Sequence, residues 1–230
     1  MITNTVENIN ALEGLKNLDD NSIDLIVTDP PYKVISGGKG DHTSPKGMLK
    51  SNDGKIFEHN DIEITEWIDD CYRVLKDNTH IYVMVNMLNL SEYMTEIEKA
   101  GFKIHNLLVW QKNNVTPNRW YMKNCEYIIF AYKGKAKMIN NVGSSNTVHI
   151  CKNITGNKNH PTEKPIELMK FYIENSSNKG DLVLDPFMGS GSVAIASKLS
   201  NRNFIGFEID ENYYNVIQTR LNEARTQSLF

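Results

Sequence analysis

Cysteine is scarce in this chain of 230 residues: Cys71, Cys125 and Cys151 are its three cysteines. Their odd number and wide spacing argue against a disulfide framework and against a structural zinc site built from paired cysteines. No apolar run approaches the length that spans a bilayer, and the N-terminal MITNTVENIN lacks a basic stretch followed by an apolar one. We therefore expect a reduced, cytoplasmic protein that requires no metal ion.

The charge is distributed unevenly along the chain. The net charge of −3 argues against a simple nucleic-acid binder, but residues 103–164 carry ten Lys or Arg and two acids, Glu126 and Glu163. That segment is therefore +8 and the remainder is −11. A basic segment in an otherwise acidic protein is typical of a surface that faces a polyanion. A merely lysine-rich loop explains the charge equally well.

Apolar β-branched runs alternate with amphipathic stretches over most of the chain. This alternation predicts an α/β fold with a mostly parallel sheet and one substantial core, so we expect residues 1–230 to form a single domain. The expected strands are residues 5–9, 23–28, 81–85, 104–110, 126–131, 182–184 and 204–207. The expected helices are residues 12–18, 64–75, 91–100, 165–176, 190–200 and 211–224.

Two segments largely lack both the helical and the strand periodicity of apolar residues. Residues 33–60 contain SGGKGDHTSPKG and have no apolar face, which favours a ligand-binding loop or lid. Residues 112–160 are basic and rich in asparagine, whose amide can contact base edges but equally suits turns. We expect this second segment to be an insertion that recognises a polyanion.

The sequence TDPPY follows the apolar run IDLIV at residues 23–27. Proline cannot donate to a sheet ladder, so Pro30 and Pro31 end the strand in a stiff turn. That turn presents the Asp29 carboxylate and the Tyr32 ring at the carboxyl edge of a sheet. An ordinary strand-ending turn is the alternative.

A second pattern, DLVLDPFMGSGSVAIASKLSNRNFIGFEID, reads as strand, glycine turn, helix and strand. Gly189 and Gly191 would let the backbone approach a ligand at a helix N-terminus, and Glu208 could accept ribose hydroxyls. The spacing also satisfies the dinucleotide fingerprint, but the single unit and the Asp185-Pro186-Phe187 run favour a smaller nucleoside cofactor. Just upstream, HPTEKP offers a histidine, a hydroxyl and a cation at a helix start, where Thr162 could also serve as a simple N-cap.

These motifs, in this order, resemble the β class of S-adenosylmethionine-dependent DNA amino-methyltransferases. In that class DPPY comes first, and the target-recognition region, HPxxKP and FxGxG follow. The resemblance implies a Rossmann-like methyltransferase fold with helices on both faces and a circularly permuted motif order. It places the strand at residues 5–9 next to the one at 204–207, with Asn10 near the adenine of the cofactor.

The resemblance implies roles for residues in three groups. The catalytic group is Asp29, Pro30, Pro31 and Tyr32. The cofactor-binding group is Asn10, His160, Thr162, Lys164, Asp185, Pro186, Phe187, Gly189, Ser190, Gly191, Glu208 and Ile209. For DNA we expect contacts from Lys112, Arg119, Lys123, Lys133 and Lys135.

The implied reaction methylates the exocyclic amine of a flipped base in double-stranded DNA, without a metal ion. Asp29 can accept one amine hydrogen and the Pro30 carbonyl the other, while Tyr32 stacks on the base. Asp at position 29 favours adenine N6, with cytosine N4 as the alternative. A catalytically silent binding module and a methyltransferase for RNA or protein amides also remain open, as do a homodimer and a cognate restriction endonuclease.

Overall fold

The structure, a computed structural model, describes residues 2–31, 62–116, 120–154 and 163–227. Within these residues the strands form one eight-stranded sheet in the order β1-β8-β7-β2-β3-β5-β4-β6. The strands are β1 (Thr5–Glu7), β2 (Ile23–Thr28), β3 (Leu75–Val85), β4 (Lys103–Thr116), β5 (Lys123–Tyr132), β6 (Val148–Ile150), β7 (Leu182–Asp185) and β8 (Asn203–Phe207).

The first five strands of that order pair in parallel, and β5 is antiparallel to both of its neighbours. β1 pairs with β8 even though the two lie at opposite ends of the chain, with Val6 opposite Gly206. This pairing is the one that the permuted motif order predicted. The predicted fold class, a mostly parallel sheet with helices on both faces, is confirmed.

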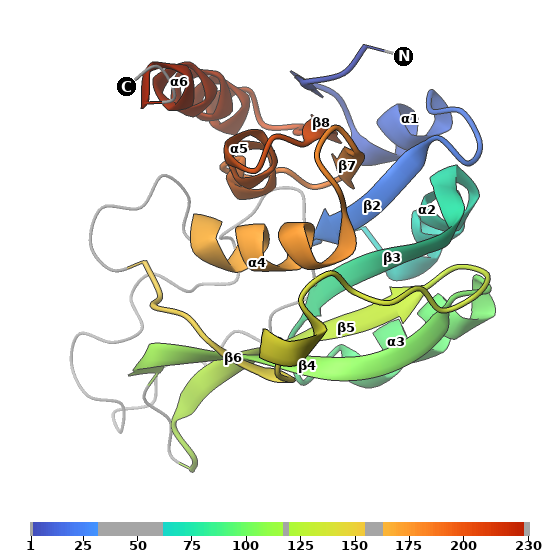
Figure 1. Cartoon of the computed structure of the whole chain (residues 1–230), viewed down its shortest axis with the longest axis vertical. Helices are drawn as coiled ribbons and strands as arrows, with labels where there is room; N and C mark the ends of the chain where they lie inside the picture. The colour runs from blue at the N-terminus through green and yellow to red at the C-terminus, as the bar shows by residue number, and fades with distance from the viewer. Residues whose placement is uncertain (1, 32–61, 117–119, 155–162, 228–230) are drawn as a thin grey trace, which may run out of the picture.

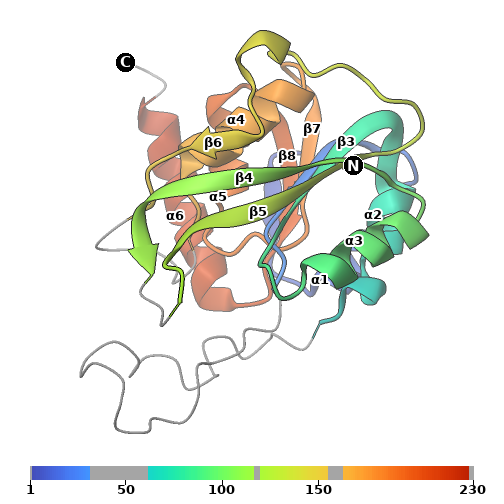
Figure 2. The same cartoon turned by 90° about the horizontal axis from the view of Figure 1, so that it is seen from below.

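Helices cover both faces of the sheet (Figures 1 and 2). One face carries α1, α2 and α3, and the other carries α4, α5 and α6. The helices are α1 (Ala11–Lys16), α2 (Ile68–Val74), α3 (Leu90–Lys99), α4 (Ile166–Ser176), α5 (Ser192–Leu199) and α6 (Glu211–Gln227), with 3-10 turns η1 (Ile64–Glu66) and η2 (Val142–Ser144).

The sequence of the central strand β2 is an almost continuous apolar run because the strand is buried on both faces. Ile23 and Ile26 enter the core under α1, α2 and α3, whereas Leu25 and Val27 enter the core under α4 and α5. A strand that is buried on both faces has no polar alternation. The strand ends at Thr28, as the two prolines predicted.

Several element boundaries differ from the sequence prediction. The helix expected over residues 64–75 is η1 followed by α2, and β3 starts at Leu75, six residues before the expected start. The polar residues Lys76, Asp77, Asn78 and Thr79 concealed the beginning of this strand. The short strand β6 was also missed, since its three residues VHI are too few to show a period.

The predicted insertion over residues 112–160 overlaps two strands of the main sheet. Residues 112–116 belong to β4 and residues 123–132 form β5, both inside the main sheet. Asparagines and lysines at the ends of these long strands hid their continuation past the core. Within the described part of the segment, residues 133–154 therefore make up the portion that follows β5, and they return to the sheet through β6.

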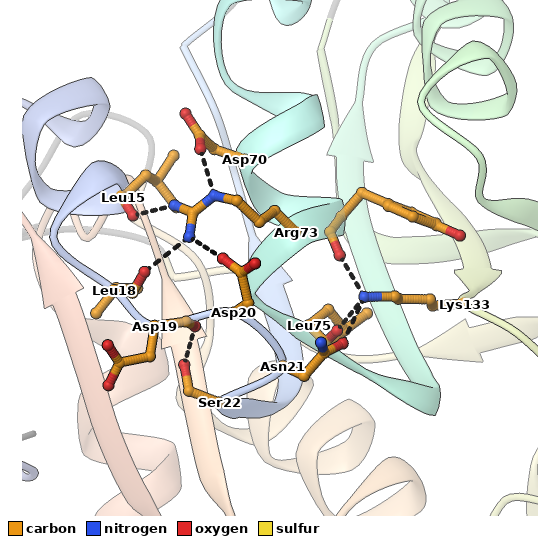
Figure 3. Close-up of polar contacts among 11 residues, drawn as sticks. Leu15, Leu18, Asp19, Asp20, Asn21, Ser22, Asp70, Arg73, Leu75 and Lys133 are labelled. Atoms are coloured by element: carbon orange, nitrogen blue, oxygen red, sulfur yellow. Dashed lines mark hydrogen bonds and ion pairs between the residues drawn. The ribbon is translucent and has the colours of Figure 1, made fainter.

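At the amino edge of the parallel strands, Arg73 from α2 fastens the turn between α1 and β2 (Figure 3). Its guanidinium donates to the carbonyl oxygens of Leu15 and Leu18, each at 2.8 Å. It also binds the carboxylates of Asp20 at 2.7 Å and Asp70 at 2.9 Å. These contacts occupy polar groups of the amino edge, so we expect a ligand site at the opposite, carboxyl edge of the sheet.

Lys133 lies at the same amino edge, so its prediction as a DNA contact is wrong. Its buried ammonium donates to Asn21 Oδ1 at 2.7 Å and to the carbonyl oxygens of Tyr72 and Leu75 at 2.9 and 2.7 Å (Figure 3). A fully engaged buried ammonium cannot also bind phosphate. The sequence counted its charge as a surface charge because burial cannot be read from the charge alone.

Candidate active site

Three adjacent parallel strands, β2, β7 and β8, each end in a carboxylate of the expected site. Asp29 follows β2, Asp185 is the last residue of β7, and Glu208 follows β8. Because parallel strands end at one edge of the sheet, the fold gathers groups that are almost 180 positions apart in the sequence. The permuted motifs therefore meet in space.

A pocket at this edge joins all three motif regions. Its empty volume is about 390 Å³, which includes space open to solvent. It is lined by Asp29, by Glu163 and Lys164 of the HPTEKP segment, and by the turn and first residues of α5, together with Met169. The lining from that turn is Asp185, Phe187, Met188, Gly189, Ser190, Ser192 and Val193.

Asp29 is held on one oxygen and open on the other. Its Oδ2 forms an ion pair with the Lys164 ammonium, while its buried Oδ1 has no hydrogen-bond partner among the described residues. Burial raises the pKa of this carboxyl above its ordinary value, and the nearby Lys164 opposes that rise. An unpartnered buried acceptor costs stability unless a ligand satisfies it, so Oδ1 marks a site for a hydrogen-bond donor.

Asp185 links the end of β7 to the end of β2. Its Oδ1 accepts hydrogen bonds from the Thr28 hydroxyl at 2.8 Å and the Phe187 N–H at 3.0 Å. Burial raises its pKa to about 7, against the lowering effect of these two hydrogen bonds. Pro186 is buried beside it, so this turn is stiff.

The glycine turn adopts the conformation that its sequence predicts. Gly189 and Gly191 have φ values of 53° and 84°, a region that favours glycine. The Ser190 carbonyl between them accepts from Arg220 at 2.6 Å, and Gly191 is the N-cap of α5. The Phe187 ring packs edge-on against Trp67, with 5.4 Å between centroids. The turn is thus fixed before any ligand binds.

Glu208 is anchored to the same turn. Its Oε2 accepts the Gly189 N–H at 2.7 Å and its Oε1 accepts the Asp210 N–H at 2.9 Å. Each carboxylate oxygen keeps a second lone pair for an incoming hydroxyl. Burial raises the pKa of Glu208, while the N–H donors oppose that rise. The next residue, Ile209, leaves its apolar side chain partly exposed.

Asn10 also lies at this edge, after β1, but its amide oxygen has a structural role. Oδ1 accepts the Leu12 N–H at 2.8 Å and caps α1. A helix N-cap explains the residue without any ligand. The expected contact between this oxygen and an adenine ring therefore competes with the cap.

The expected DNA contacts separate by location. Lys112 forms an ion pair with Glu126 and its ammonium lies 4.7 Å from the centroid of the Trp110 ring, so it is not a free surface cation, contrary to prediction. Lys123, at the start of β5, is exposed at the carboxyl edge. Lys135 is exposed just past the end of β5, which antiparallel pairing puts at the amino edge, away from Asp29.

Some predicted residues lie outside the described part of the chain. These are Tyr32, Arg119, His160, Thr162 and the loop 33–60. The helix after HPTEKP begins at Ile166 with Pro165 as its N-cap.

Sequence reasoning missed several residues that the fold brings to the site. Glu126 and Glu163 were counted merely as the two acids of a basic segment, yet Glu163 lines the pocket and binds Arg220, and Glu126 lies 3.5 Å from the ammonium of Lys164. Their isolation among ten basic residues was the available signal. Trp120 and Tyr121, in the β4–β5 connection, are 86% and 93% exposed, which the sequence did not indicate.

The fold and the site together define an α/β protein in which a glycine turn lies beside Asp29, a carboxylate with one oxygen that has no hydrogen-bond partner among the described residues. A family model described as DNA methylase matches residues 23–219, and the chain belongs to that family. The predicted resemblance is therefore confirmed, and the protein is a DNA methyltransferase of the amino-methylating kind.

Individual relatives agree with this assignment. The chain is 34% identical over 239 residues to Type II methyltransferase M.HpaI of Haemophilus parainfluenzae, covering 93% of this chain and 72% of that one. It is 30% identical over 242 residues to Type II methyltransferase M2.MboI of Moraxella bovis, covering 93% and 86%.

Solved structures give the same result. The crystal structure of the M1.HpyAVI–SAM complex matches with a TM-score of 0.72 and 29% identity over 95% of this chain and 98% of that one. The cytosine-N4-specific PvuII DNA methyltransferase matches with a TM-score of 0.70 over 94% of this chain and 87% of that one, but its 19% identity supports the fold alone. In the described part of the chain, no helix is long and apolar enough to cross a membrane.

Proposed function

We propose that the protein transfers a methyl group from S-adenosylmethionine to N6 of adenine in double-stranded DNA. The observation that carries this proposal is Asp29, whose buried Oδ1 lacks a partner among the described residues and borders the pocket of the glycine turn. An amine N–H is the donor that this oxygen requires. An aspartate at this position favours adenine over cytosine.

The chemistry explains why an acceptor matters more than a strong base. The lone pair of an exocyclic amine is delocalised into its ring, which makes it a poor nucleophile. Asp29 Oδ1 and the Pro30 carbonyl, fixed by the turn, each accept one N–H and favour a tetrahedral nitrogen whose lone pair points at the methyl group. S-adenosylmethionine supplies that methyl group on a positively charged sulfur.

The target base must leave the duplex to reach a carboxylate at this depth. The sequence suggests Tyr32 as the surface on which the extruded base stacks, since this residue follows Pro31 directly. Asp29 orients the base and can receive the proton after transfer. The amine becomes strongly acidic on methylation, so an ionised carboxylate is sufficient.

The residues present fit a nucleoside cofactor. The turn around Gly189 and Gly191 lies at the N-terminus of α5 and borders the pocket, and Glu208 sits beside it with lone pairs for ribose hydroxyls. The partly exposed Ile209 offers an apolar surface for an adenine ring. Asp185, Phe187 and Ser190 line the pocket and Pro186 lies between the first two in the chain, while the roles proposed for His160 and Thr162 rest on the sequence.

We propose that DNA lies across the carboxyl edge at the β4–β5 hairpin. This hairpin projects beyond the body of the sheet (Figures 1 and 2). It combines the exposed cation Lys123 with the exposed rings of Trp120 and Tyr121, which suits phosphate and base contacts respectively. A homodimer and a companion restriction endonuclease are further proposed partners, the latter supported by relatives named Type II methyltransferases.

The test is methylation of unmodified DNA followed by mass spectrometry of its nucleosides. We expect N6-methyladenine from the wild type, and no product from Asp29→Ala although this variant still binds the cofactor. N4-methylcytosine would identify the cytosine alternative instead. Binding of cofactor and DNA without any product would indicate a silent module, and product from RNA but not DNA would overturn the substrate.

A further inference from the structure

The ammonium of Lys164 lies between two partly buried carboxylates. It forms an ion pair with Asp29 Oδ2 and lies 3.5 Å from Glu126 Oε2. The Lys164 side chain is 6% exposed, and those of Asp29 and Glu126 are 22% and 23% exposed. An ammonium so far from water is stable only beside such partners. The three groups therefore form one electrostatic unit.

Lys112 completes this unit on the outer side. It forms an ion pair with Glu126 and its ammonium lies over the Trp110 ring, 4.7 Å from the centroid. Two cations and two carboxylates thus alternate in the order Lys112, Glu126, Lys164 and Asp29, and their charges cancel. Balanced alternation is the arrangement that makes a buried charge network tolerable.

The backbone of Lys164 is fixed as firmly as its ammonium. Its carbonyl oxygen accepts the Ser192 hydroxyl at 2.7 Å, which joins the segment to the first turn of α5. The preceding residue, Glu163, binds Arg220 of α6 at 2.7 Å. With both sides anchored, the side chain has one well-defined direction, toward Asp29.

We propose that Lys164 is a positioning residue for the reaction, which binds Asp29 Oδ2 so that Oδ1 alone faces the target amine, and that Glu126 holds Lys164 there. This inference rests on the proposed function and deepens it. It also gives Lys164 a different role from the one expected from sequence, which was to bind the cofactor. In the structure its ammonium instead faces protein carboxylates.

The charges around Asp29 give the two positioning residues opposite effects. Burial raises the pKa of Asp29, Lys164 lowers it, Glu126 raises it and Lys112 lowers it. Burial raises the pKa of two other titratable groups, Asp185 and Tyr93, and the charge of Asp29 raises both further. Removing Lys164 should thus favour the protonated carboxyl, which is a weaker acceptor for the amine N–H and cannot take up its proton. Removing the Glu126 charge should favour the carboxylate.

The experiment measures the single-turnover methylation rate on DNA from pH 5 to pH 9 for wild type, Lys164→Gln, Lys164→Arg and Glu126→Gln. For Lys164→Gln we expect a rate roughly 10- to 100-fold lower at neutral pH. The acidic limb of its pH–rate profile should be displaced to higher pH. Lys164→Arg keeps the positive charge, so it should recover part of the rate, and its acidic limb should lie at the same pH as that of the wild type. Glu126→Gln should displace the limb to lower pH.

Cofactor affinity, measured by calorimetry on the same variants, separates the two roles of Lys164. A positioning role predicts affinity within about threefold of wild type for Lys164→Gln. A large loss of cofactor affinity with an unmoved pH limb would overturn the proposal in favour of cofactor binding. Limbs that move in the same direction for Lys164→Gln and Glu126→Gln would also overturn it.

Two controls keep the outcomes distinct. Thermal unfolding of each variant identifies a protein that has lost its fold, and Glu126→Gln then still tests the direction of the shift. A wild type that methylates no amine in any nucleic acid would refute the proposed function itself. An active wild type whose rate and pH profile are unchanged by Lys164→Gln would refute the positioning role alone.

Discussion

Arg220 of α6 joins the two motif regions of the cofactor pocket by binding Glu163. Its Nη2 lies 2.7 Å from Glu163 Oε1, while its Nη1 donates to the Ser190 carbonyl at 2.6 Å. The side chains are 13% and 3% exposed. A residue more than 200 positions into the chain therefore helps to hold HPTEKP against the glycine turn.

Loss of this pair should destabilise the fold. Arg220→Ala leaves a buried Glu163 carboxylate without its cation, and breaking such a pair costs about 3 to 5 kcal/mol. Urea unfolding measures the change. The matched control is Lys170→Ala, which removes an exposed ion pair with Glu174 at 3.8 Å and should cost less than about 1 kcal/mol. Equal effects in the two variants would show that the Arg220 pair has no special role.

Gly206 should not tolerate even a methyl group. A Cβ at this position in β8 would lie 2.2 Å from Met188 Cε and 2.5 Å from the Asp185 carbonyl oxygen. Because the second contact is to backbone, Gly206→Ala should displace the turn, cost about 1 to 3 kcal/mol and weaken cofactor binding. Gly143→Ala, which meets nothing within 4 Å, should change stability by less than about 0.5 kcal/mol. Wild-type cofactor affinity in Gly206→Ala would contradict the prediction.

Sequence reasoning identified the turns that meet at the carboxyl edge because their signals are local. Two consecutive prolines end a strand in any protein, and the positive φ values of the turn favour glycine at positions 189 and 191. It could not separate the lysines, because Lys123, Lys133 and Lys164 look alike in sequence and differ only in what the fold puts beside them. One is exposed, one is buried at the amino edge, and one is buried against Asp29. Long-range pairing decides this, and no local pattern encodes it.

Asp185 should make stability depend on pH. Burial raises its pKa from the ordinary 3.8 to about 7, so between these values the unfolded chain releases a proton that the folded protein retains. The free energy of unfolding should therefore fall as pH rises from about 4 to about 7. Asp185→Asn cannot titrate and keeps the acceptor for Thr28, so its denaturant midpoint should decline less over this range. An identical slope in variant and wild type would contradict the raised pKa.

Charge reversal at two exposed lysines should distinguish the edges of the sheet. Lys123 starts β5 at the carboxyl edge beside the exposed Trp120 and Tyr121, whereas Lys135 follows β5 at the amino edge. If DNA crosses the carboxyl edge, Lys123→Glu weakens DNA binding and lowers the slope of log affinity against log salt by about one, since one phosphate contact is lost. Lys135→Glu makes the same change in net charge and should leave both quantities near wild type. Fluorescence anisotropy at several salt concentrations measures them. Equal losses would mean that only the overall charge matters. A larger loss for Lys135→Glu would place DNA at the amino edge, where Arg73 and Lys133 bind the backbone.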